Sequence, residues 1–198
     1  MTKIIPRLKK TSNNRLSKIE YYLSIAEQLT KRATCRGFHA GALIVKDDQI
    51  ISTGYNGAPR KTMDCYERGN CLRRTLKIMS GTRYELCRSV HAEQNAIINA
   101  ARAGVSLLGG DLYLFGYKAH LGAREVVDTI PCFICKKMII NAGLNKIICA
   151  CKNGKYKIFT VKKWAQEWRS NDIVDDQDQF GQNIQYDQEN LKKNKKGK

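Results

Sequence analysis

The chain has 198 residues, 42% of them hydrophobic, which is enough for one globular domain with a sizeable core. No apolar run approaches the roughly 20 residues of a membrane-spanning helix, and the opening MTKIIPRLKK lacks the apolar core of a secretion signal, so we expect a cytoplasmic protein without membrane contact. The net charge is +17, and residues 1–170 hold 30 basic against 12 acidic side chains, which favours an anionic substrate or partner, although a lysine-rich surface would give the same count.

A helix and a β-hairpin are predicted first. Apolar residues recur at helical spacing over residues 14–33, with Ser12 or Asn13 placed to cap the helix. Residues 41–55 contain two short apolar runs around a polar turn and predict a hairpin. Residues 56–88 show no sustained period, and a loop of that length inside a compact domain usually has a function or a cross-link.

Helices and strands then alternate. Small apolar residues over 91–103 predict a helix, 112–115 a buried strand, and 131–142 a second helix that opens with proline. Residues 146–150 predict another strand. An Asn-Gly pair separates it from the apolar run 156–161, which predicts a hairpin and therefore an antiparallel last strand.

The end of the folded part is marked by Trp164 and Trp168, four residues apart on a predicted final helix. We expect one folded domain over residues 1–172 and a polar, disordered tail over 173–198. The order of elements predicts a layered α/β domain in which helices cover both faces of a mixed five-stranded sheet.

Candidate metal ligands stand in two motifs. Eight cysteines in a chain expected in the cytoplasm are better explained as metal ligands and core residues than as disulfides. His91 stands two residues before Glu93, and Cys132 and Cys135 follow Pro131 as C-x-x-C. One imidazole and two thiolates suit tetrahedral zinc with its fourth position open to water.

The chemistry of such a site follows from its residue types. Both motifs fall at predicted helix starts, where the helix dipole favours thiolates. Zinc lowers the pKa of water towards about 7, and Glu93, which is not needed as a ligand, can carry protons between water and substrate. Structural zinc or a chance C-x-x-C is the alternative, but the joint pattern is more specific than a lone C-x-x-C. We predict a catalytic zinc held by His91, Cys132 and Cys135, with Glu93 as proton carrier.

H-x-E followed by P-C-x-x-C is the signature of zinc-dependent nucleobase deaminases, and over residues 14–150 the chain resembles the deoxycytidylate (dCMP) deaminase family of the cytidine deaminase superfamily. The matching stretches are 31–35, 51–59, 91–97 and 131–143. The metal motif is shared with other deaminases, whereas the TGYNGAP stretch is similar to the deoxycytidylate branch. The resemblance implies a three-layer cytidine-deaminase-like fold.

The resemblance also implies an activity. It implies hydrolysis of dCMP to dUMP and ammonia, a reaction on the C–N bond of a cyclic amidine, within pyrimidine nucleotide metabolism. It further implies a homo-oligomer, often a hexamer, with dCTP activating and dTTP inhibiting in many members. Asn56 would hydrogen-bond the nucleotide sugar; its alternative reading is a turn residue after a strand.

Four cysteines precede the catalytic motif: Cys35, Cys65, Cys71 and Cys87. Four thiolates suit a closed structural zinc site, and some relatives carry a second zinc at corresponding places. Since Cys87 lies four residues before His91, such a site would brace the catalytic helix. Ordinary buried cysteines are the alternative.

The chain departs from the family pattern twice. Residues 116–130 form an insert before the second motif; Lys118 or Arg124 within it could hold a phosphate or simply face solvent. The antiparallel last strand is the arrangement of cytidine deaminases, whereas deoxycytidylate deaminases usually have a parallel one.

Two other functions remain open at this point. One is a deaminase that acts on another nucleoside, nucleotide or tRNA base, which the basic charge would suit. The other is a non-catalytic nucleic-acid-binding protein with a deaminase fold. The intact His91, Glu93, Cys132 and Cys135 argue against the second, and no interleaved aromatic and basic stretch favours single-strand binding.

Overall fold

The computed structural model describes residues 15–79, 82–120 and 123–170. The predicted tail over 173–198 and the predicted caps Ser12 and Asn13 lie outside these ranges. The strands are β1 (Phe38–Lys46), β2 (Gln49–Tyr55), β3 (Asp111–His120), β4 (Ala123–Val126), β5 (Lys146–Ala150) and β6 (Tyr156–Thr160). The α-helices are α1 (Lys18–Leu29), α2 (Leu72–Thr75), α3 (Ala92–Arg102), α4 (Phe133–Asn141) and α5 (Val161–Ser170), with short 3-10 turns at Thr30–Arg32, Tyr84–Leu86 and Lys152–Gly154.

One mixed sheet runs in the order β2-β1-β3-β5-β6, and β4 pairs with the end of β3. The five predicted strands are all present, and β6 lies antiparallel to β5 as predicted. The predicted strand count was wrong by one, because β4 was not foreseen. Its sequence is Ala-Arg-Glu-Val with three of four positions exposed, so no apolar pattern marks it.

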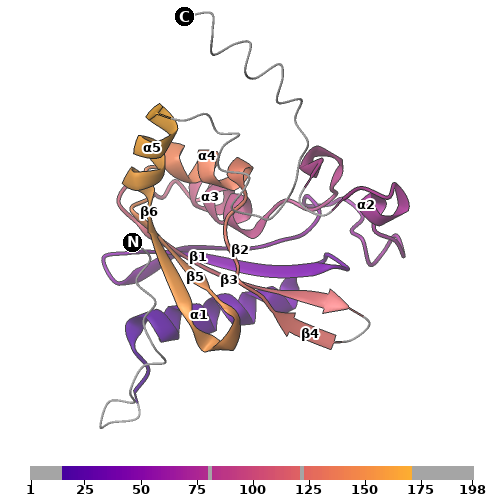
Figure 1. The fold of residues 1–198 in the computed structure, drawn as a ribbon, viewed down its shortest axis with the longest axis horizontal. Helices are drawn as coiled ribbons and strands as arrows, with labels where there is room; N and C mark the ends of the chain where they lie inside the picture. Colours follow the sequence, from indigo (N-terminus) through magenta and orange to yellow (C-terminus); the bar gives the residue numbers. More distant parts are fainter. Residues whose placement is uncertain (1–14, 80–81, 121–122, 171–198) are drawn as a thin grey trace, which may run out of the picture.

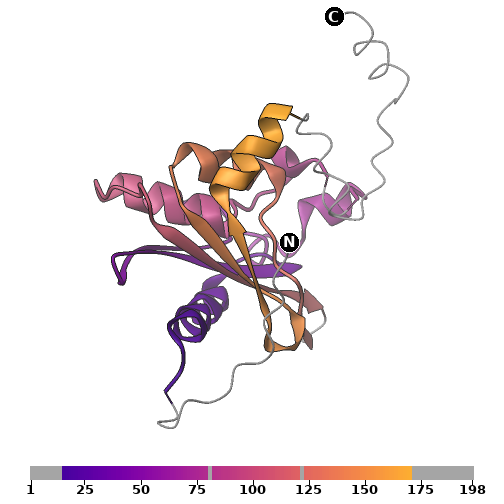
Figure 2. The same cartoon turned by 60° about the vertical axis from the view of Figure 1, so that its left-hand side comes forward.

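The helices form a layer on each face of the sheet, as both views in Figures 1 and 2 show. Along β1, side chains alternate between the two layers, as the two-residue period of a strand requires. Ala40, Ala42 and Ile44 join the core formed with α3, α4 and α5, whereas Leu43 and Val45 join the core against α1. The predicted three-layer α/β fold is confirmed.

The first helix begins later than predicted, at Lys18. Ser17 Oγ accepts a hydrogen bond from Glu20 N (3.2 Å), and Glu20 Oε2 accepts one from Ser17 N (3.0 Å). This reciprocal capping box satisfies two backbone donors at the helix start. Among the described residues, no helix combines the length and apolar character needed to cross a membrane.

Candidate zinc and active site

Helix α3, which carries His91 at its start, is fixed at close range to β2. Gly54 faces the helix, and a Cβ there would lie 2.4 Å from Ala92 O and from Ala96 N. Three side-chain hydrogen bonds join the two elements: Ser52 Oγ to Ala96 O (2.6 Å), Asn95 Nδ2 to Tyr55 O (2.7 Å) and Asn99 Nδ2 to Thr53 O (2.7 Å). The depth of α3 against the sheet is therefore set by polar contacts and the missing side chain at Gly54.

The segment leading into α4 is anchored to β5, to β6 and to the turn between them. Thr129 N donates to Ala150 O at the end of β5 (3.0 Å). Asp128 accepts hydrogen bonds from Lys152 N and Lys157 Nζ, each at 3.0 Å. Cys132 then takes the N-cap position of α4, so both cysteines sit at its first turn.

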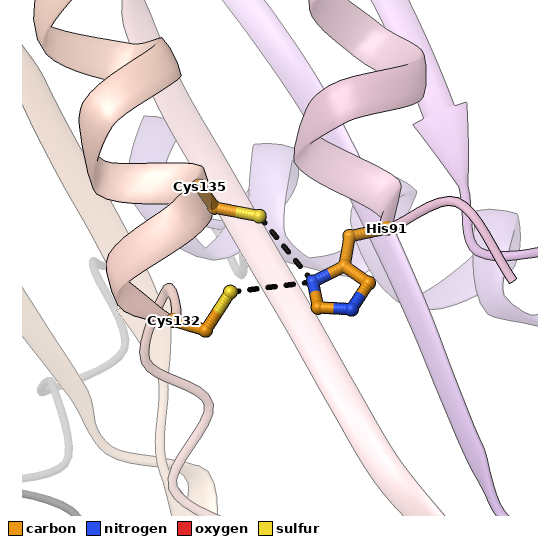
Figure 3. A group of neighbouring side chains, drawn as sticks. All are labelled: His91, Cys132 and Cys135. Atoms are coloured by element: carbon orange, nitrogen blue, oxygen red, sulfur yellow. Dashed lines mark hydrogen bonds between the residues drawn. The ribbon is translucent and has the colours of Figure 1, made fainter. Parts of the chain in front are cut away.

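His91, Cys132 and Cys135 come together between the starts of α3 and α4 (Figure 3). The Nδ1 atom of His91 lies 3.4 Å from the sulfur of each cysteine. Zinc bonds of about 2.3 Å to sulfur and about 2.0 Å to nitrogen, at a tetrahedral angle, separate the two ligand atoms by roughly 3.5 Å. The three donors therefore fit zinc in identity and in spacing. Among the described residues they form the one group of three or more His, Cys, Asp or Glu side chains whose ligand atoms lie this close.

The contact between the two cysteines changes the pKa values of their thiols. The hydrogen bond with Cys135 lowers the pKa of Cys132 against the effect of burial, and His91 lowers it further. The same contact and burial raise the pKa of Cys135. The pair therefore favours a thiolate at Cys132, which is the form of the side chain that binds metal.

Glu93 is the second residue of α3, in its first turn, and is 5% exposed. Burial raises the pKa of its carboxyl above the ordinary value, while His91 opposes that shift. A carboxyl whose pKa moves towards neutrality can both take and give a proton at working pH. Burial of an acid beside a ligand triad is the arrangement expected for a proton carrier.

This geometry agrees with a family comparison. The sequence model described as "Cytidine and deoxycytidylate deaminase zinc-binding region" matches residues 16–151.

The chain belongs to this family.

Two relatives of the chain are named deoxycytidylate deaminases. That of Schizosaccharomyces pombe is 30% identical over 128 residues, which is 65% of this chain and 35% of the relative. That of Mycobacterium phage D29 is 32% identical over 134 residues, covering 65% of this chain and 91% of the relative. The chain therefore spans about a third of the fission-yeast protein. The crystal structure of dCMP deaminase from cyanophage S-TIM5 in complex with dCMP and dUMP is 26% identical, with a TM-score of 0.46 over 65% of this chain and 76% of that one.

Asn56, predicted to contact a sugar in this family, is buried at the end of β2. Its Nδ2 donates to Phe38 O (2.8 Å), and its Oδ1 accepts from Ala40 N (2.7 Å). The next residue, Gly57, exchanges two backbone hydrogen bonds with Val90. The Asn56 amide thus ties β2 to β1, and the sugar contact stays a prediction that would use its second N–H.

The four cysteines that precede the catalytic motif interact with one another. Burial raises the pKa of the Cys65 thiol, and Cys35 and Cys71 raise it further. Burial likewise raises the pKa of Cys87, with additions from Cys35 and Cys65. These thiols interact electrostatically, but within the described part of the chain they do not form a close ligand group as the triad does. The second zinc stays a prediction.

The two basic residues of the insert point in different directions. Arg124 pairs with Glu27 of α1, and its guanidinium lies 4.6 Å above the Tyr117 ring. It therefore belongs to the α1 layer, opposite the triad. Lys118 is exposed and lies 3.9 Å from Glu125 across the β3–β4 pair.

A cavity of about 760 Å³ lies beside α3 but apart from the zinc ligands. Asn95, Ile98, Asn99 and Arg102 line it from the helix, opposite the loop over residues 57–64. Neither the triad nor Glu93 lines it, so this cavity is not where a reaction at the triad would occur.

Sequence reasoning missed two residues beside the triad, Arg73 and Tyr84. The Tyr84 ring lies edge-on to the His91 imidazole, with centroids 5.0 Å apart. The Arg73 guanidinium lies over the Tyr84 ring, 5.1 Å from its centroid. Both residues come from the segment over 56–88, which shows no sustained periodicity. Its position shortly before His91 was the one sequence feature that could have indicated a contact with the site.

Proposed function

We propose that the protein is a zinc-dependent hydrolase that converts dCMP to dUMP and ammonia. The observation that carries the proposal is the pairing of the His91–Cys132–Cys135 triad with the buried Glu93 carboxyl. The family relatives named deoxycytidylate deaminases support dCMP as the substrate. The excess of basic side chains also suits a substrate that carries a phosphate.

The reaction exchanges an amino group for oxygen at C4 of the base. His91, Cys132 and Cys135 would hold the zinc, which supplies Lewis acidity that lowers the pKa of water from about 15.7 towards about 7. Glu93 takes a proton from the attacking water and gives it to ring nitrogen N3, then carries the second water proton to the departing amine. The C4–N bond breaks, one water proton remains on N3 of the uracil, and the other leaves with ammonia.

Ammonia release from a panel of substrates tests this proposal. Purified protein with zinc is offered dCMP, deoxycytidine, CMP and a tRNA anticodon stem at equal concentrations. We expect turnover of dCMP to exceed that of the other three. Turnover of another panel member without turnover of dCMP would replace the substrate assignment but leave the chemistry intact. No ammonia from any of them, with zinc bound, would favour the non-catalytic alternative.

We also propose that Asn56 contacts the nucleotide sugar through the N–H that does not bond Phe38. Asn56→Asp removes both amide N–H donors and places a carboxylate against Phe38 O. The expected result is a raised KM for dCMP together with a lower unfolding midpoint. A change in the unfolding midpoint with an unchanged KM would assign Asn56 to the fold alone.

A second, structural zinc held by Cys35, Cys65, Cys71 and Cys87 is proposed as well. The electrostatic interactions of Cys65 and Cys87 with their neighbouring thiols support it, because four thiolates suit a closed structural zinc site. Metal analysis should find two zinc ions per chain, falling to one in Cys71→Ser. One zinc per chain in the wild-type protein would remove this second site.

The proposed setting is the cytoplasm, with the protein as a homo-oligomer. All eight cysteines are free in the structure, which suits a reducing compartment. Exposed large apolar side chains, among them Met63, Ile98 and Leu108, offer surface for contacts between copies. Light scattering of the purified protein should give several times the mass of 22.5 kDa expected for one chain.

A further inference from the structure

The segment between β2 and α3 is organised by arginine side chains. Arg73 Nη2 donates to two backbone carbonyls, Met79 O (2.5 Å) and Thr82 O (2.6 Å). Arg88 Nη1 donates to the backbone oxygen and to the side-chain oxygen of Asn70, at 3.0 Å each. These contacts add to the little regular structure that the described part of the segment has, namely the four-residue helix α2 and one 3-10 turn.

The folded segment delivers one aromatic ring to the zinc centre. Arg73 lies over Tyr84, and Tyr84 meets His91 at an interplanar angle of 87°. The positive edge of one ring against the negative face of another is a favoured aromatic geometry, and a guanidinium over a ring face is favoured for the same electrostatic reason. The three side chains therefore contact one another in series, from guanidinium to phenol ring to imidazole.

Arg73 makes these contacts at a cost. Its Nε–H is buried and has no hydrogen-bond partner among the described residues. Buried donors are nearly always paired, so an unpaired one calls for a compensating role. The contacts that the guanidinium does make all hold the loop that ends in Tyr84.

We propose that Arg73 and Tyr84 are a positioning pair for the zinc ligand His91: the guanidinium holds the Tyr84 ring, and the ring holds the imidazole with Nδ1 towards Cys132 and Cys135. The inference rests on the proposed zinc centre and not on the choice of dCMP as substrate. Metal-binding histidines are normally oriented by a group outside the ligand set, and loss of such a group costs 10- to 100-fold in metal affinity. Here an aromatic edge supplies that orientation.

The test compares zinc affinity, measured by competition with a chelator, in full-length variants. Tyr84→Leu should bind zinc about 10- to 100-fold more weakly than the wild type. Tyr84→Phe keeps the ring and should keep wild-type affinity. Arg73→Gln should weaken binding in the same direction, because the ring loses its support, and Arg73→Lys should restore part of the loss through the retained charge over the ring.

The chain offers a matched control. Arg124 lies over Tyr117 in the same kind of contact, 4.6 Å from the ring centroid, on the opposite face of the sheet. Arg124→Gln and Tyr117→Leu should leave zinc affinity unchanged. A second readout is the visible absorption of the cobalt-loaded protein, which reports ligand geometry; it should change in Tyr84→Leu and match the wild type in Tyr84→Phe and in both controls.

The experiments distinguish failure of the zinc centre from failure of the positioning pair. A wild-type protein that binds no zinc would overturn the proposed function. If the wild type binds zinc and Tyr84→Leu binds it equally well, with an unchanged cobalt spectrum, the positioning pair is refuted while the zinc centre stands. Equal losses in Tyr84→Leu and Tyr84→Phe, or in Tyr84→Leu and Tyr117→Leu, would also refute it, because the ring contact at His91 would then have no specific effect.

Discussion

Replacing Gly54 by alanine should damage catalysis more than its effect on folding explains. The added Cβ would lie 2.4 Å from two backbone atoms of α3, whereas ordinary contact begins at 3.4 Å, so the helix would have to retreat by about 1 Å. Overpacking of this kind costs about 1–3 kcal/mol, and the upper end applies because backbone atoms cannot rotate away. Since α3 carries His91 and Glu93, a shift of 1 Å is enough to lower turnover by about 100-fold.

Gly41→Ala is the matched control on the other face of the sheet. Its Cβ would lie 2.1 Å from Ala26 O of α1, a tighter clash than the one at Gly54. Urea unfolding should therefore show Gly41→Ala to be at least as destabilised. Ammonia release from dCMP, scaled to the folded fraction, should nevertheless fall far less than in Gly54→Ala, because α1 carries none of the zinc ligands.

Two results would refute this reasoning. Turnover of Gly54→Ala that matches the wild type per folded molecule would show that α3 accommodates a side chain without moving the site. An equal loss of turnover in Gly41→Ala would show that activity follows stability alone.

Three more predictions concern single side chains. Glu93→Gln should lower turnover by about 10²- to 10⁴-fold while metal analysis finds the wild-type zinc content. Cys135→Ser should release zinc at chelator concentrations that the wild-type protein withstands, because a thiolate ligand is lost. Burial opposes ionisation of Asp128, but hydrogen bonds from Lys157 and Lys152 N hold the pKa of this carboxyl below its ordinary value. Its contribution is therefore present above the unfolded-state pKa and lost as the pH falls through the folded-state pKa. Asp128→Asn should lower the unfolding free energy by up to about 1 kcal/mol at pH 7, and the difference should disappear in acid once this carboxyl is protonated in the folded protein.

Each of these predictions has a contrary outcome. An active Glu93→Gln enzyme would remove the proton-carrier role. Wild-type zinc retention in Cys135→Ser would mean that this sulfur is not a ligand. Equal urea midpoints for Asp128→Asn and the wild type at pH 7 would show that solvent screens the contacts of this half-exposed carboxylate completely.

The zinc triad could be predicted from the sequence because its chemistry depends on residue type and short spacing. Two cysteines three residues apart at a helix start must share one side of that helix, whatever surrounds them. The antiparallel β6 was equally legible, since the Asn153-Gly154 pair specifies a tight reversal: Asn153 has a φ of 66°. Local sequence fixes local geometry in both cases.

Tertiary contacts decided what could not be predicted. The start of α1 is an exception, because the Ser17–Glu20 capping box is a local S-x-x-E pattern that the sequence itself carries. The partners of the Asn56 amide lie on β1, which no local pattern announces. Arg73 reaches carbonyls six and nine residues away without any periodic signal. Residues of this kind are recognised only when the segment is seen folded.

The bonds around Asn56 also bear on chemical ageing. An asparagine followed by glycine is prone to deamidation, in which the backbone nitrogen of the glycine attacks the side-chain carbonyl. Here Gly57 N is held by Val90 O (3.1 Å), and the Asn56 amide is bonded to β1. The exposed Asn153-Gly154 pair lacks such shelter. During storage, deamidation should therefore add its first negative charge at Asn153, in the β5–β6 turn. Asn56 should remain unmodified while the sheet stays folded.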